Sequence, residues 1–168
     1  MMTPELSSKQ PRNTFSKKIF WFLILLGLIL PWILRISVEA FFKPEQIGRI
    51  LSDFPRLLFA PGHNLFLLGI LNAFPVAIFV FLGRWRYKAC AGLEPAAFFP
   101  HQLGIILAGL AVFGMSLFIH LVVWMDVFSP KGGSSTSVIA FVFLPFYALA
   151  AMPVGYLLGW LMGKLIRK

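Results

Sequence analysis

Three side chains of types that bind transition metals stand where predicted helices begin or end: His63, His120 and Asp126. Imidazole and carboxylate groups are common ligands of zinc and related ions, so these residues are the candidate metal ligands of the chain. The competing interpretation is that they make ordinary hydrogen bonds at a membrane surface. We favour this second interpretation and expect no bound metal and no cofactor.

No catalytic motif accompanies these residues. The single cysteine, Cys90, excludes an intrachain disulfide and any cysteine-rich metal site. Gly132 and Gly133 are not followed by the Lys-Ser/Thr pair of a phosphate-binding loop. Ser116 and His120 lie one helical turn apart on the same helix, whereas a catalytic base needs its partner placed across from it. The sequence therefore predicts that the protein is not an enzyme.

The most specific spacing in the chain is a run of small residues at intervals of four near the C-terminus: Ala151, Gly155, Gly159 and Gly163. On a helix this spacing places all four on one face, where the backbone of a second helix can approach closely within a membrane. Two partners remain open for this face. One is another helix of the same chain, and the other is a separate membrane protein or a second copy.

The composition indicates a membrane protein. Hydrophobic residues make up 59% of the chain, charged residues only 12%, and the mean hydropathy is +0.85. A soluble domain carries roughly 25% charged residues. The net charge of +9 comes from short basic clusters beside apolar runs, which indicates topology in a lipid bilayer and not binding to nucleic acid.

The expected fold is all-α: a bundle of about four transmembrane helices plus one short interfacial amphipathic helix. A polar cytoplasmic tail at 1–18 precedes a single integral-membrane domain at 19–168. The apolar runs are long enough to cross a bilayer core of about 30 Å. The predicted spans are 19–36, 64–83, 103–125 and 138–163, and residues 83–102 are expected to form the main inner loop. Pro31, Pro145 and Pro153 are expected to bend their helices.

The segment 44–58 has a different pattern from the spans. Its apolar residues recur every three or four positions and its charged residues lie on the opposite side, as in a helix lying in the membrane surface. Pro55 is expected to end or bend this helix. The residues expected to face the membrane are Ile47, Ile50, Leu51 and Phe54.

Three polar residues lie in or beside the predicted spans. Arg35 and Glu39 are four residues apart on one helix face, so we expect an ion pair, solvated at the level of the lipid headgroups. Asn72 falls near the middle of its span, where an unpaired amide is costly. We expect it to join two helices, and a position along a substrate path is the alternative.

The basic residues also predict orientation. Ten of the fifteen fall in the N-terminal tail, the 83–102 segment and the C-terminal tail, so the positive-inside rule places both termini in the cytoplasm. We infer a multi-pass protein of a bacterial inner membrane.

The favoured function is non-catalytic: a small subunit or accessory protein that binds and positions another integral membrane protein, or copies of itself, through the glycine face. The alternatives are a small oligomeric channel or transporter, and a membrane immunity or regulatory protein that binds its target through the interfacial helix.

Overall fold

The computed structural model describes residues 17–60, 64–90, 92–130 and 135–167. These ranges are almost entirely helical and contain no strand, which confirms the all-α fold class. The elements in chain order are α1 (Lys17–Phe42), the short 3-10 helix η1 (Pro44–Gln46), α2 (Ile47–Leu57), α3 (Leu65–Cys90), α4 (Pro95–Phe128) and α5 (Ser135–Ile166).

Four of these helices, α1, α3, α4 and α5, are long and apolar enough to cross a membrane. Large apolar side chains such as Phe81 and Phe146 are exposed along their outer faces. In water this exposure would be costly, but the hydrocarbon core of a bilayer is itself apolar. The described part of the chain therefore has the architecture of a multi-pass membrane protein.

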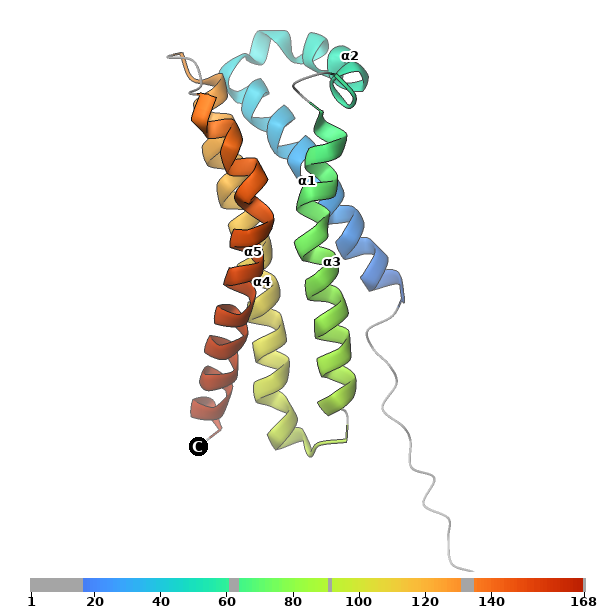
Figure 1. Ribbon diagram of the computed structural model, residues 1–168, viewed down its shortest axis with the longest axis vertical. Helices are drawn as coiled ribbons and strands as arrows, with labels where there is room; N and C mark the ends of the chain where they lie inside the picture. The colour runs from blue at the N-terminus through green and yellow to red at the C-terminus, as the bar shows by residue number, and fades with distance from the viewer. Residues whose placement is uncertain (1–16, 61–63, 91, 131–134, 168) are drawn as a thin grey trace, which may run out of the picture.

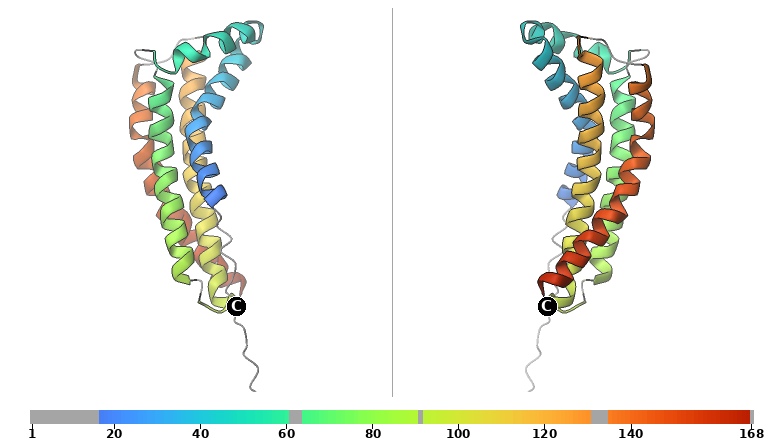
Figure 2. Two further views of the ribbon diagram at one scale, coloured as in Figure 1. Left: turned by 90° about the vertical axis from the view of Figure 1, so that its right-hand side faces the viewer. Right: turned by 90° about the vertical axis from the view of Figure 1, so that its left-hand side faces the viewer.

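The four long helices run side by side, and α2 lies across one end of the bundle (Figure 1). We call this the α2 end, and the opposite end, where the chain terminates, the C-terminal end. The views of Figure 2, from two opposite sides of the bundle, show that α5 follows a curved path across α4. Because Pro145 and Pro153 both lie inside α5, the curvature agrees with the bending expected of these residues.

The helices extend further than the apolar runs predict. The segment 83–102, expected to be a loop, is mostly helical, because α3 continues to Cys90 and α4 already begins at Pro95. Proline fits at the first position of a helix, where its missing N–H has no intrahelical acceptor. Likewise Pro55 does not end α2, which continues to Leu57. Proline therefore marks the start of η1 and of α4 but not the end of α2.

The buried apolar side chains form two clusters along the bundle. One lies toward the α2 end and consists of Val38, Leu65, Ile119, Val123, Trp124, Phe141 and Leu144. The other lies further toward the C-terminal end and consists of Val76, Phe79, Val80, Ile105, Ala108, Val112 and Ala148. Both clusters draw on α3, α4 and α5, so the bundle is packed internally along its length.

The glycine face of α5 packs against α4 of the same chain. A Cβ atom added to Gly159 would lie 2.5 Å from the carbonyl oxygen of Leu103, and one added to Gly155 would lie 2.6 Å from that of Leu107. A Cβ atom added to Gly163 would lie similarly close to the backbone of Pro100. Ala151, one turn before Gly155, is half-buried. Of the two partners left open above, the structure places α4 on this face, so it is not free to bind a separate protein.

Helices α1 and α3 are joined by close backbone approach and by two polar contacts. The side-chain amide nitrogen of Asn72, which is fully buried, donates a hydrogen bond to the carbonyl oxygen of Gly27. The indole nitrogen of Trp32 donates to the carbonyl oxygen of Leu65 at 2.8 Å. Asn72 therefore lies in a contact between two helices of one chain.

Candidate functional site: a polar pocket at the α2 end

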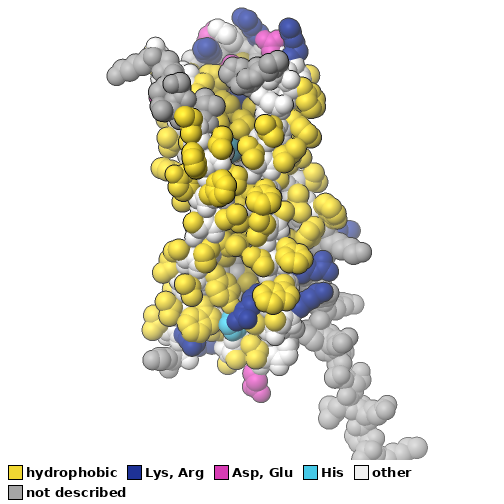
Figure 3. All heavy atoms as spheres, in the orientation of Figure 1, with side chains coloured by type: hydrophobic (Ala, Val, Ile, Leu, Met, Phe, Trp, Pro, Cys, Tyr) yellow, Lys and Arg dark blue, Asp and Glu magenta, His cyan; other side chains and the backbone are white. Residues whose placement is uncertain are grey.

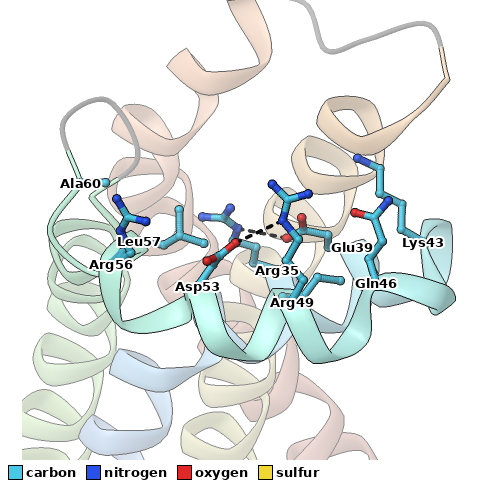
Figure 4. Close-up of a pocket in the computed structure, with 10 residues that line it drawn as sticks. Arg35, Glu39, Lys43, Gln46, Arg49, Asp53, Arg56, Leu57 and Ala60 are labelled. Carbon is cyan, nitrogen blue, oxygen red and sulfur yellow. Dashed lines mark ion pairs between the residues drawn. The ribbon is translucent and has the colours of Figure 1, made fainter.

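A pocket of about 500 Å³ lies between the last turns of α1 and the helix α2 (Figure 4). We call it the α2-end pocket. Its volume lies within the range of about 300–1,000 Å³ that is typical of ligand sites. The residues that line it are Arg35, Glu39, Lys43, Gln46, Arg49, Ile50, Asp53, Arg56, Leu57 and Ala60.

The spacing of the charged residues explains why they meet. Arg49, Asp53 and Arg56 are four and three residues apart on α2, so all three lie on one helix face. On α1, Arg35 and Glu39 are likewise one turn apart. Figure 4 shows the side chains from α2 and those from α1 converging on the same space.

The apolar side of α2 holds this arrangement in place. Ile50 is buried, and the ring of Phe54 packs edge-on against Trp32 with centroids 6.0 Å apart. Ile47 and Leu51 remain exposed. The four residues predicted to face the membrane therefore divide into two that anchor α2 to the bundle and two whose apolar side chains remain exposed.

Arg35 is the most buried charge of the pocket, with 8% of its surface exposed. Its guanidinium carbon lies 5.5 Å from the ring centre of Trp124 and 6.0 Å from that of Phe128. Its Nε lies 3.7 Å from Glu39 Oε2, an ion-pair distance. The expected ion pair with Glu39 is thus present. Its arginine is covered by two aromatic rings of α4 and is less solvated than predicted, whereas Glu39 is half-buried.

The hydrogen-bonding capacity of Arg35 is largely unused. Neither its Nε nor its Nη1 has a hydrogen-bond acceptor, although both atoms are buried. A guanidinium group carries five N–H donors, and leaving buried donors unpaired is costly. Arg35 therefore places buried N–H donors without an acceptor at the wall of the pocket.

Cations outnumber carboxylates in the pocket by four to two. The second ion pair, Arg49 with Asp53, joins Nε and Oδ2 at 3.5 Å. Lys43 and Arg56 have no ion-pair partner within the described ranges. A concave surface lined by charge of one sign attracts the opposite sign, so the pocket is suited to an anionic group.

The candidate metal ligands are not brought together by the part of the chain that the structure describes. His63 lies outside the described residues. His120 is 1% exposed, and its ring lies 4.9 Å from that of Phe141. No group of three His, Cys, Asp or Glu side chains forms in the described ranges, Asp126 included. Ser116 is buried on the same face of α4 as His120, without a hydrogen-bond partner.

The fold and the pocket define a class: a multi-pass α-helical membrane protein with a cationic pocket at one end. Comparisons of the chain with protein-family models, with curated protein sequences and with solved structures find no match. Sequence reasoning placed Arg49 and Asp53 on the polar side of the interfacial helix but did not single them out. The spacing of Arg49, Asp53 and Arg56 could have indicated that these three charged residues share one helix face.

Proposed function

We propose that this protein is a non-catalytic accessory protein that binds an integral membrane partner through an acidic group held in the α2-end pocket. The observation that carries the proposal is the excess of cations in this pocket, with Arg35 buried and short of acceptors. Arginine is well suited to this task, because its planar guanidinium pairs with a carboxylate through two parallel hydrogen bonds.

The packing of the helices supports the same conclusion. The glycine face of α5, the most specific helix-packing surface in the sequence, is covered by α4. The α2 end combines polar recognition groups with the exposed apolar residues Ile47 and Leu51 beside them. A partner that lies in the same membrane can contact both. We further propose a bacterial inner membrane with cytoplasmic termini, which places the α2 end outside the cytoplasm.

The experiment compares two double variants with equal loss of charge. Lys43→Gln with Arg56→Gln removes the two pocket cations that form no ion pair with any described residue. Arg84→Gln with Lys88→Gln is the matched control, since both residues lie on α3 at the opposite end of the bundle. Each form is extracted gently from its native membrane, and the mass and composition of the complex are determined.

We expect a second protein to accompany the wild type and the control variant in a fixed ratio. The pocket variant should lose this protein. Equal retention by both variants would overturn the proposal, as would a wild type that carries no other protein. Ion or solute flux through liposomes that contain this protein alone would instead establish the transport alternative.

A further inference from the structure

A second cavity of about 450 Å³ opens between α3 and α5 in the C-terminal half of the bundle. Ile105 and Ala108 of α4 are buried and form its floor, while Trp85 and Leu157 stand exposed at its walls. Its lining is almost entirely apolar. We call it the α3–α5 groove, and its lining residues are Phe79, Leu82, Gly83, Trp85, Arg86, Ile105, Ala108, Met152, Pro153, Tyr156 and Leu157.

Three polar side chains from three helices meet at one end of this groove. Arg86 Nε on α3 donates a hydrogen bond to the hydroxyl oxygen of Tyr156 on α5 at 3.0 Å. The same hydroxyl lies 2.7 Å from Nδ1 of His101 on α4, to which it can donate its proton. The terminal Nη2 of Arg86 also lies 3.5 Å from Nδ1 of His101. Together these contacts fix the direction of the guanidinium, and they leave both N–H groups of Nη1 and one of Nη2 for a ligand.

The charge around this cluster is strongly positive. Arg86 has no carboxylate partner within the described ranges. His101 also lines a neighbouring recess of about 370 Å³, together with Lys164 and Arg167 of α5. Figure 3 shows hydrophobic side chains over the middle of the molecule and basic side chains toward both ends, with a histidine among those toward the C-terminal end.

The depth of Arg86 matches the level of lipid phosphates. Arg86 follows Leu65, the first residue of α3, by 21 positions, which corresponds to about 31 Å along a helix. The hydrocarbon core of a bilayer is about 30 Å thick. With the start of α3 at one surface, Arg86 therefore stands at the other, and the apolar groove extends from it into the hydrocarbon.

We propose that the α3–α5 groove binds one anionic phospholipid, with an acyl chain along the groove and the phosphate at the terminal nitrogens of Arg86. The excess of cations at this end selects a lipid with net negative charge, since the ammonium group of a zwitterionic headgroup would face Lys164 and Arg167. This inference is independent of the proposed function and concerns the opposite end of the molecule.

The test is native mass spectrometry of the purified full chain with phosphatidylglycerol or phosphatidylcholine of identical acyl chains. Arg86→Gln removes the side chain proposed to bind the phosphate. Arg86→Lys keeps the positive charge but lacks the planar set of N–H donors of a guanidinium group. Lys88→Gln is the matched control, because Lys88 is exposed on the same helix and does not line the groove. Gel filtration and circular dichroism establish that each variant is folded.

The wild type and Lys88→Gln are expected to retain one phosphatidylglycerol, and Arg86→Gln to retain roughly tenfold less, as expected for loss of a charge-assisted hydrogen bond. Arg86→Lys should fall between them. Equal retention of the two lipids by the wild type, or equal retention by folded Arg86→Gln, would overturn the proposal. Binding of glycerol phosphate as tight as that of the lipid would also overturn it, because the groove would then contribute nothing.

Discussion

Arg35 makes a cation–π contact with Trp124: its guanidinium carbon lies 5.5 Å from the centre of the indole ring. This contact joins the end of α1 to α4 and places a buried cation at the wall of the α2-end pocket. The same residue forms an ion pair with Glu39. The pocket is thus built on the bundle itself and not only on the short helix α2.

Two arginine–carboxylate pairs of identical spacing provide a test of this burial. The side chain of Arg35 is 10% exposed and that of Arg49 is 78% exposed. Arg35→Ala removes the contacts of a buried cation with Trp124 and leaves the half-buried Glu39 without its partner, so we expect it to lower the free energy of unfolding by about 3 kcal/mol. Arg49→Ala should change it by less than about 0.5 kcal/mol. Unfolding curves in detergent measure both, and equal losses would contradict the buried position of Arg35.

The contact between α4 and α5 predicts opposite effects of adding one methyl group at two glycines. Gly159→Ala forces the methyl group into the backbone of Leu103, and we expect a loss of about 2 kcal/mol. Gly114 has open space around its Cβ position, so Gly114→Ala should be neutral or stabilise α4 by up to about 1 kcal/mol. Thermal unfolding of the two variants is the measurement. A Gly159→Ala variant as stable as the wild type would rule out this close contact.

Two buried polar side chains differ in whether they have a partner. Asn72→Ala removes the hydrogen bond to Gly27 between α3 and α1, which should cost about 1 kcal/mol. Ser116→Ala removes a buried hydroxyl that has no hydrogen-bond partner, so we expect little loss or a small gain in stability. Denaturation of both variants under the same conditions makes the comparison. A larger loss for Ser116→Ala would show that its hydroxyl has a partner.

The proposed partner interaction should depend on salt. Lys43 and Arg56 are exposed, and attraction between exposed charges is screened within about 8 Å at physiological ionic strength. Raising the salt concentration from about 0.05 to 0.5 M should therefore weaken the complex severalfold. Binding that is unchanged over this range would exclude the two exposed cations as the main contacts.

The fold class could be predicted because it depends on properties that every residue carries locally. Apolar runs of sufficient length have few stable alternatives to membrane-crossing helices, since a bilayer offers no partners for free backbone groups. The ends of the helices were less predictable. Arg84, Arg86 and Lys88 continue α3 beyond the apolar run, and hydropathy gives no signal for a polar helical turn.

The sequence by itself determined the helices, the amphipathic character of α2 and the presence of a face made for close packing. Only the tertiary structure decided which helix covers Gly155 and Gly159, because a face of small residues accepts many partners. It likewise decided that Arg35 is buried, since Trp124 and Phe128 come from a distant helix. Both sites depend on such contacts: the α2-end pocket unites α1 with α2, and the α3–α5 groove unites three helices.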